Sequence, residues 1–278
     1  MSGALYVIAT PVGNLEDLSP RALRLLGEVD LIACEDTRHT RKLLSRFAIQ
    51  TPTTSYHEHN EVSKTPELIE KLARGSQIAL VSDAGTPLLS DPGYHLIHGC
   101  REQGIPVYPV PGPTAATAAL SVSGLPTDHF FFQGFLPRRV SARRQQLETI
   151  GRLKATLVIY LSPHSVLTTL KRIREVLGNR QAFLGREMTK LHETHYPGNL
   201  EQILKQLQQE KPRGEYTLVV EGQHSKTNQL GRSAKPDVLA YVAGLRALYG
   251  LSRKDAIQRA SRELDLPKRE VYRTVIEG

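Results

Sequence analysis

Short apolar runs alternate with stretches of helical period along most of this chain. The apolar runs predict strands, over 4–9, 29–34, 77–82 and 106–110 in the first part and over 129–135, 155–161, 181–187 and 215–222 in the second. Apolar residues three and four positions apart predict helices between these strands, over 19–28, 66–75, 93–104, 114–124, 165–178 and 199–210. Such alternation is typical of mainly parallel sheets covered by helices, and we expect two of them.

The end of the chain has a different pattern. Three stretches have helical periodicity with no strand between them: 236–250, 252–264 and 267–277. Ser252 is a predicted N-cap with Asp255 three residues further on, and Pro267 can begin the last helix. The short link between the last two helices gives a helix-turn-helix-like pattern, which many small helical modules share.

These patterns divide the chain into three parts. A length of 278 residues favours more than one domain. We expect an α/β domain over 1–116, a second α/β domain over 117–230 and a C-terminal helical module over 231–278.

The composition is ordinary for a soluble globular protein. Hydrophobic residues make up 40% of the chain and charged residues 23%, and no apolar run approaches the length of a membrane span. The N-terminus lacks a basic region followed by a long apolar stretch, so we expect no secretory signal and no membrane partner. Cys34 and Cys100 are the only cysteines. They cannot form a disulfide framework or a zinc site, so we expect no metal and a cytoplasmic location.

The net charge of +8 is concentrated in two segments. Residues 138–154 carry six basic residues and one acidic residue, and residues 232–278 carry ten basic and six acidic residues. A basic surface in two places is typical of a protein that binds a polyanion such as nucleic acid. Two solvated helix faces are the alternative interpretation.

Three loops rich in small residues follow predicted strands of the first domain. They are TPVGNL (10–15), SDAGTPLLSDPG (82–93) and PGPTAA (111–116). Ligands bind beyond the carboxyl ends of strands in parallel sheets. None of the three matches a dinucleotide-binding or phosphate-binding loop. Glycine and proline also punctuate ordinary turns, but three such loops in one domain favour a ligand site.

The motifs of the chain resemble, in order, those of the ribosomal RNA small subunit methyltransferase I family, a branch of the tetrapyrrole methylase superfamily. The resemblance rests on TPVGNL, EDTRHT (35–40), SYHEHNE (55–61), LVSDAGTPLLSDPGY, PGPTAA, GLPTDHF, GFLP, REMTKLHE and PRGEYTLVVEG. SDAGTP and EDTRHT are specific to this branch, whereas PGPTAA is shared with the tetrapyrrole enzymes. The resemblance extends from about Leu5 to the end of the chain.

The resemblance implies a fold and a cofactor. The family fold is of the class III methyltransferase type, with two α/β domains and S-adenosylmethionine in the cleft between them, usually in a homodimer. By analogy with the superfamily, the cofactor contacts are Pro11, Gly13, Asp83, Ala84, Gly85, Thr86, Leu89, Thr114, Ala115, Leu161 and Met188. Small residues at 84 and 85 suit close approach of the backbone to a ligand.

The implied reaction is methylation of the ribose 2′-oxygen of a cytidine, cytidine 1402, in the decoding region of 16S rRNA of the small ribosomal subunit. The candidate catalytic residues are Glu35, Asp36 and Lys190; His57 and Glu187 are further candidate bases. Each of the five also has a structural interpretation as an ion pair or a loop hydrogen bond, and the sequence identifies no base. The expected RNA contacts are Arg38, His57, Asn60, Arg138, Arg139, Arg143 and Arg144.

Two residues depart from the family pattern after the strand at 155–161. Leu161 and Ser165 stand where the family usually has a glutamate and an arginine, which puts the register of the substrate in question more than the fold. Two alternatives therefore stay open: a methyltransferase of the same superfamily that acts on a tetrapyrrole, and a non-catalytic RNA-binding assembly protein. A small-molecule enzyme would not need the basic segments or the terminal helices.

Overall fold

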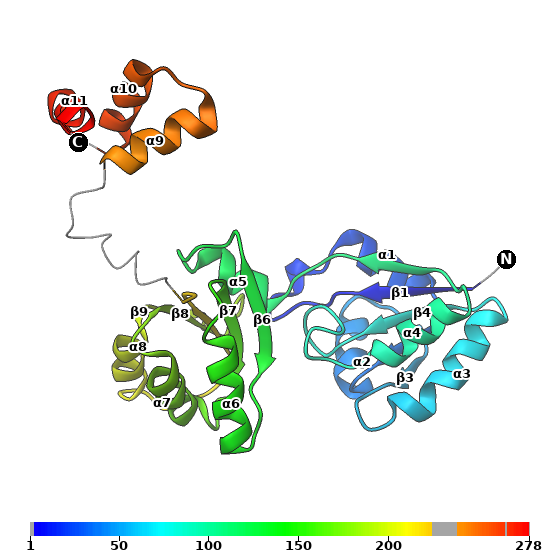
Figure 1. The fold of residues 1–278 in the computed structure, drawn as a ribbon. Coiled ribbons are helices and arrows are strands. Elements are labelled where there is room, and N and C mark those ends of the chain that lie inside the picture. The colour runs from blue at the N-terminus through cyan, green and yellow to red at the C-terminus, as the bar shows by residue number, and fades with distance from the viewer. Residues whose placement is uncertain (1–2, 224–237, 265, 278) are drawn as a thin grey trace. The chain divides into compact units, whose positions relative to one another are not determined.

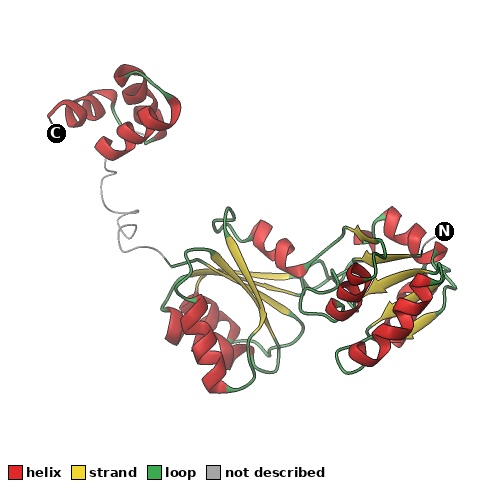
Figure 2. Cartoon of the chain, turned by 45° about the vertical axis from the view of Figure 1, so that its right-hand side comes forward, coloured by secondary structure: helices red, strands yellow, loops and turns green. Residues whose placement is uncertain are grey.

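The computed structural model describes residues 3–223, 238–264 and 266–277. Residues 1–223 form one compact unit and residues 224–278 a second. The described part of the first unit contains two five-stranded sheets with helices on their faces (Figures 1 and 2). This arrangement confirms the expected α/β fold class with additional C-terminal helices.

The first sheet has the strand order β3-β2-β4-β1-β5, and all its pairs are parallel. Its strands are β1 (Ala4–Ile8), β2 (Leu31–Cys34), β3 (Thr53–Ser55), β4 (Gln77–Val81) and β5 (Val107–Val110). The four strands expected in this region are confirmed. The sequence does not reveal β3, because its three residues are polar and half-buried and form no apolar run.

Helices cover both faces of the first sheet. They are α1 (Pro20–Glu28), α2 (Thr37–Arg46), α3 (Glu61–Ala73) and α4 (Tyr94–Glu102), with a short 3₁₀ helix, η1 (Leu15–Asp17), before α1. Apolar residues of α1 and α2 pack on one face of the sheet, and those of α3 and α4 pack on the other. The sheet is therefore buried on both sides, which explains why its strands are short continuous apolar runs.

The second sheet has the order β6-β7-β10-β8-β9 and is mixed. Its strands are β6 (Phe130–Phe135), β7 (Thr156–Leu161), β8 (Gln181–Arg186), β9 (Thr194–Asn199) and β10 (Tyr216–Val220). Only the β6–β7 pair is parallel; β10 is antiparallel to both β7 and β8, and β8 is antiparallel to β9. The expectation of a second mainly parallel sheet is therefore wrong.

The reason lies in how the strands are inserted. The helix α7 (Val166–Leu177) connects β7 to β8, and these two strands run in the same direction, as the alternating pattern predicts. They are not neighbours, however, because β10 enters between them from the other direction. The strand β9, with the sequence THYPGN, is not predicted because proline and glycine interrupt it.

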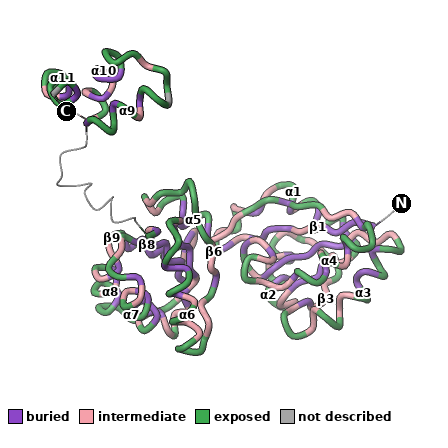
Figure 3. The backbone as a smooth tube through the Cα atoms, in the orientation of Figure 1, coloured by how far each residue is buried: buried purple, intermediate pink, exposed green. Residues whose placement is uncertain are grey.

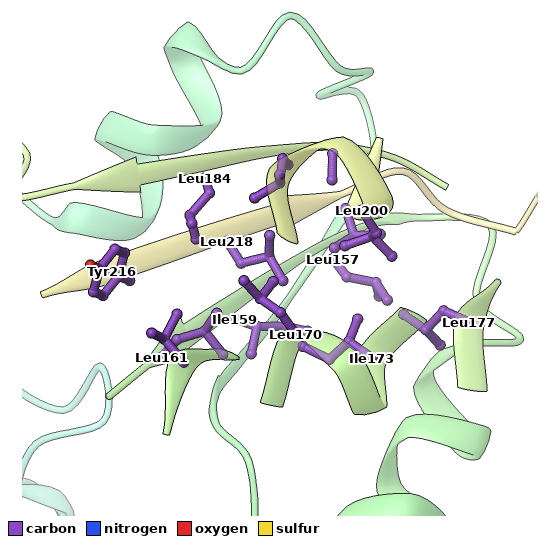
Figure 4. Packing of buried hydrophobic residues seen from close by; sticks show 14 of the residues in the cluster. Leu157, Ile159, Leu161, Leu170, Ile173, Leu177, Leu184, Leu200, Tyr216 and Leu218 are labelled. Atoms are coloured by element: carbon purple, nitrogen blue, oxygen red, sulfur yellow. The ribbon is translucent and has the colours of Figure 1, made fainter. Parts of the chain in front are cut away.

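Two clusters of apolar side chains enclose the second sheet. Alternate residues of β7, namely Leu157, Ile159 and Leu161, pack with α6 (Val140–Ile150), α7 and α8 (Leu200–Leu207) (Figure 4). The residue between the first two, Val158, packs with α5 (Ala115–Val122) on the opposite face. Purple segments in Figure 3 follow these buried strands. The proposed boundary between residues 116 and 117 falls within α5 and stays a prediction.

The second unit contains three helices among its described residues: α9 (Val238–Tyr249), α10 (Arg253–Glu263) and α11 (Lys268–Glu277). They match the three expected helices and share an apolar core that includes Val242, Ile257 and Val271. Ser252 caps α10, and its hydroxyl oxygen accepts a hydrogen bond from the Asp255 backbone N–H at 3.2 Å. The proposed boundary at 230/231 lies outside the described residues. No described helix is both long enough and apolar enough to cross a membrane.

Candidate functional site

The three small-residue loops of the first domain meet at one edge of its sheet. They follow β1, β4 and β5, which are neighbours in the order β4-β1-β5. The Thr10 N–H donates to the Gly85 carbonyl at 2.8 Å, and the Gly85 N–H donates to the Thr10 carbonyl at 2.9 Å. The Thr86 hydroxyl donates to the Pro113 carbonyl at 3.1 Å. The loops therefore form one connected surface.

Gly85 lies at the centre of this surface in a left-handed backbone conformation, with φ +84°. Residues with a side chain rarely adopt this region, because their Cβ crowds the following carbonyl. A Cβ at this position would also contact the Val12 side chain at 3.4 Å. The backbone conformation therefore favours glycine at this position.

A cavity of about 760 Å³ opens beside these loops and extends to the second sheet. This volume falls within the range typical of small-molecule sites. Nine of the eleven expected cofactor contacts line it: Asp83, Ala84, Gly85, Thr86, Leu89, Thr114, Ala115, Leu161 and Met188. Pro11 and Gly13 do not line it, but Val12 between them does.

Apart from Ser165, whose departure from the family pattern falls at the expected cleft, the sequence predicts no site role for the remaining residues that line the cavity. They are Val12, Ser90, Asp91, Phe135, Leu136, Tyr160, Ser162, Pro163, Ser165, Thr169, Glu215, Tyr216 and Thr217, besides the candidates Glu35, Arg138 and Arg143. Most come from the second domain, where Leu161 of β7 pairs with Tyr216 of β10. This pairing, which brings PRGEYTLVVEG beside the end of β7, has no signal in the local pattern.

Lys190 forms two ion pairs and does not line the cavity. Its ammonium group lies 2.9 Å from Glu187 Oε1 and 2.9 Å from Glu215 Oε2. Burial would lower the pKa of Lys190, but the hydrogen bonds to these two carboxylates outweigh it and raise the pKa. The Lys190 side chain also occupies the space into which a Cβ on Gly13 would point. A lysine has to lose its positive charge before it can act as a base, so this arrangement favours the structural interpretation of Lys190.

Asp36 and Glu35 have opposite environments. Asp36 caps α2 and pairs with Arg38 at 2.9 Å, and its hydrogen bonds to Arg38 lower its pKa to about 2. It does not line the cavity. Burial and the nearby Asp83 carboxylate raise the pKa of Glu35, which does line the cavity. Of these two candidates, only Glu35 is placed to act on a bound molecule.

A third carboxyl group with a shifted pKa, that of Asp91, lines the same cavity as Glu35. Burial, together with the charges of Glu35 and Asp83, raises its pKa to about 7, although a hydrogen bond from Ser82 acts in the opposite direction. The motif SDPG that contains Asp91 is visible in the sequence. The environment of Asp91 is not visible in the sequence, because Glu35, Asp83 and Asp91 follow different strands or lie in different parts of a loop.

We expect the Asp91→Asn substitution to stabilise the protein more at pH 8 than at pH 5. A carboxyl with a raised native pKa is protonated in the native state at pH 5 but ionised in the unfolded state, so the wild type loses stability as pH rises toward 7. Asparagine cannot ionise and avoids this loss. Because the site is open to solvent, we expect only about 1–2 kcal/mol of relative gain at pH 8.

Urea unfolding at pH 5 and pH 8 measures this effect. Glu67→Gln is the control, because Lys64 lowers the pKa of the exposed Glu67 by a hydrogen bond at 2.6 Å. Its effect on the free energy of unfolding is expected to be the same at both pH values. An Asp91→Asn effect that is equally independent of pH would contradict the raised pKa.

The candidate RNA contacts are not equally free. Arg143 donates to the carbonyls of Pro137 at 2.9 Å and Arg138 at 3.1 Å, so it supports the loop before α6. Arg144 pairs with Glu148 at 2.8 Å. Arg138 and Arg139 are exposed, and no ion pair to either is found within the described ranges. These two are the best placed of the four to meet a phosphate.

The other candidate RNA contacts lie near α2 and α3, outside the cavity lining. Arg38 is exposed and bound to Asp36. The Asn60 side chain accepts from the His57 N–H at 2.8 Å and donates to the Ser55 carbonyl at 3.2 Å. Asn60 therefore stabilises the turn between β3 and α3, and its amide group is already engaged.

The cavity fits S-adenosylmethionine by its chemistry. Apolar side chains from both domains, including Val12, Leu89 and Met188, suit an adenosine and a methylene chain. The carboxyl groups of Glu35 and Asp83 give one wall a negative charge that suits a sulfonium cation. The left-handed Gly85 leaves its loop without a side chain at the surface of the cavity.

Comparisons with known proteins agree with this picture. Residues 4–204 match the family model of tetrapyrrole (corrin/porphyrin) methylases. A ribosomal RNA small subunit methyltransferase I from Synechocystis is 43% identical over 276 residues, 99% of this chain and 98% of that relative. One of the same name from Escherichia coli O157:H7 is 44% identical over 278 residues, 99% of this chain and 95% of that relative.

Solved structures share the fold at lower identity. Uroporphyrin-III-C-methyltransferase from Thermus thermophilus has a TM-score of 0.55 and 23% identity, covering 80% of this chain and 93% of that one. Diphthine synthase has a TM-score of 0.60 and 15% identity, covering 81% of this chain and 92% of that one. Because relatives that are 43% and 44% identical align with it over nearly their full length, the chain belongs to the tetrapyrrole methylase family, in its ribosomal RNA small subunit methyltransferase I branch, whose members use S-adenosylmethionine.

Proposed function

We propose that this protein transfers the methyl group of S-adenosylmethionine to the ribose 2′-oxygen of a cytidine, cytidine 1402, in 16S rRNA of the small ribosomal subunit. The observation that carries the proposal is that Arg138, at the start of the basic segment 138–154, lines the same cavity as the loop around Gly85. A cationic, exposed side chain at the border of a methyl-donor site suits an RNA backbone.

The reaction requires mainly positioning from the protein. When bound, S-adenosylmethionine supplies a methyl group on a sulfonium, which is already a strong electrophile. The loop around Gly85 and the side chains of Leu161 and Met188 line the cavity and would hold S-adenosylmethionine there. Good alignment of two reactants is worth on the order of 7–11 kcal/mol of the barrier.

The proposal includes a cytoplasmic location and a homodimer, as the family resemblance implies. Light scattering of the purified protein at several concentrations tests the homodimer directly. A monomer mass at every concentration would contradict the proposed homodimer but would not bear on the proposed reaction.

A methyl-transfer assay tests the reaction. The protein is incubated with methyl-labelled S-adenosylmethionine and, separately, small subunits from a strain lacking the modification, free 16S rRNA, or a precorrin. We expect label in RNA at a cytidine whose 3′ bond resists alkaline hydrolysis, because a methylated 2′-oxygen cannot attack the neighbouring phosphate. Label in the precorrin would favour the tetrapyrrole alternative. RNA binding without label in any substrate would favour a non-catalytic assembly protein.

A further inference from the structure

The loop that carries Asp91 is held in an unusual backbone conformation. Leu88 and Ser90 both have φ +74°, which is rare for residues with a side chain, and Gly93 has φ +143°. Such conformations cost free energy and persist only when their surroundings hold them. Both strained residues precede Asp91, which lines the cavity.

Both domains hold this loop in place. The Gly93 N–H donates to Glu61 Oε2 at 3.2 Å at the start of α4. On the other side, β6 has an irregular register between Phe132 and Gly134, and a Cβ on Gly134 would collide with the Ser90 hydroxyl. The absence of a side chain at Gly134 thus makes room for Ser90 beside β6, next to Asp91 in the cavity lining.

The four carboxyl groups that line the cavity differ in their hydrogen-bond and ion-pair partners. Asp83 Oδ1 accepts from the Asp36 N–H at 3.0 Å, and Glu35 accepts from the backbone of Asp83. Glu215 is bound to Lys190. Within the part of the chain that the structure describes, the hydrogen bond to Asp91 comes from the Ser82 hydroxyl. That hydroxyl also lies within 3.4 Å of the Ala84 and Gly85 carbonyls, which compete for its proton.

We propose that Asp91 is the general base of the reaction, which accepts the proton of the ribose 2′-hydroxyl as that oxygen attacks the methyl carbon. This rests on the function proposed above. The Asp91 carboxylate gains the proton, a bond forms between the 2′-oxygen and the methyl carbon, and the carbon–sulfur bond breaks with its electron pair left on sulfur. The products are a methyl ether, a neutral thioether and a protonated Asp91, so charge and atoms balance.

The electrostatic surroundings of Asp91 suit this role. Glu35 and Asp83 face it from the loops after β2 and β4 and make its ionised form a stronger base than an ordinary aspartate. The other ionisable groups that line the cavity are Tyr160, Arg138, Arg143, Glu215 and Tyr216 from the second domain. A base is most effective when its pKa is near the working pH, and the native pKa of Asp91 is about 7. A sulfonium beside Asp91 favours the carboxylate, so the complex should titrate at or below this value.

Asp91→Asn tests the role while preserving the shape of the side chain. We expect single-turnover methylation of small subunits to slow by about 10²–10⁴-fold, the usual contribution of a general base. Affinity for S-adenosylmethionine, measured by calorimetry, should stay within about threefold of wild type. The wild-type rate should rise about tenfold per pH unit below the apparent pKa, and the variant rate should not.

A second readout needs no activity. In protein labelled with ¹³C at aspartate carboxyl carbons, one signal should titrate near pH 7 and be absent in Asp91→Asn. Asp91→Glu keeps a carboxyl group and should recover part of the rate. If Asp91→Asn does not fold, Asp91→Ser takes its place in every measurement, with the same expected results.

The outcomes separate this inference from the proposed function. If the wild type labels no RNA, the proposed function fails. If the wild type is active and Asp91→Asn keeps its rate and pH profile, the inference fails alone. A loss of cofactor affinity greater than tenfold, with the remaining rate fully restored by saturating cofactor, would also overturn it and make Asp91 a cofactor ligand. Glu67→Gln, an exposed site on α3 outside the cavity lining, should match wild type throughout.

Discussion

Replacing Gly85 by valine is expected to abolish measurable S-adenosylmethionine binding in a protein that remains folded. Gly85 has φ +84° and exchanges two hydrogen bonds with Thr10. A β-branched residue cannot adopt this conformation without strain of about 1–3 kcal/mol, so the loop has to move. Any movement displaces the backbone that lines the cavity, and the added side chain projects toward Val12.

Calorimetric titration with S-adenosylmethionine measures the result, and we expect affinity to fall by at least about 100-fold, since 2.7 kcal/mol of lost binding corresponds to that factor. Gly104→Val is a matched control. Gly104 also has a positive φ, +66°, but lies between α4 and β5 outside the cavity lining, with open space around its Cβ position. It should lose similar stability and keep its affinity. Wild-type affinity in Gly85→Val would show that this loop does not contact the cofactor.

The double variant Arg138→Gln, Arg139→Gln is expected to bind small subunits more weakly and with a shallower dependence on salt. Both side chains are exposed and have no ion pair within the described residues. Each phosphate contact contributes roughly 0.7–0.9 to the slope of log K against log salt through counterion release. Loss of two contacts should therefore reduce the slope by about 1.4–1.8. Arg143 is left unchanged because it supports the loop.

Filter-binding titrations at several salt concentrations measure the slopes. The control is Arg24→Gln, Arg74→Gln, which removes the same net charge from ion pairs with Glu28 and Glu70 on α1 and α3. This control should keep the wild-type slope, and both double variants should bind S-adenosylmethionine normally. Parallel slopes for the wild type and the Arg138, Arg139 variant would show that these arginines form only a solvated surface.

The position of the proposed cofactor site can be predicted from the sequence because its signals are local. A glycine at 85, shortly after an apolar run, indicates a tight loop at a strand end, and the parallel first sheet places three such loops together. The individual cofactor contacts, in both domains, are implied only by the family resemblance. The resemblance does not indicate three further lining residues, Tyr160, Tyr216 and Thr217, because their place in the cavity depends on how β10 pairs with β7.

The sequence by itself determined the layers of the fold. Continuous apolar runs indicate strands that are buried on both faces of a sheet, and helical periodicity indicates helices that are buried on one side. Only the tertiary structure decided the order and direction of strands in the second sheet, because strand pairing joins residues far apart in the chain. It likewise decided the chemistry of Asp91. Asp36, whose partner Arg38 is only two residues away, has a pKa of about 2, whereas burial and the charges of Glu35 and Asp83 raise the pKa of Asp91 to about 7. Only folding creates that burial and brings the two other carboxylates beside Asp91.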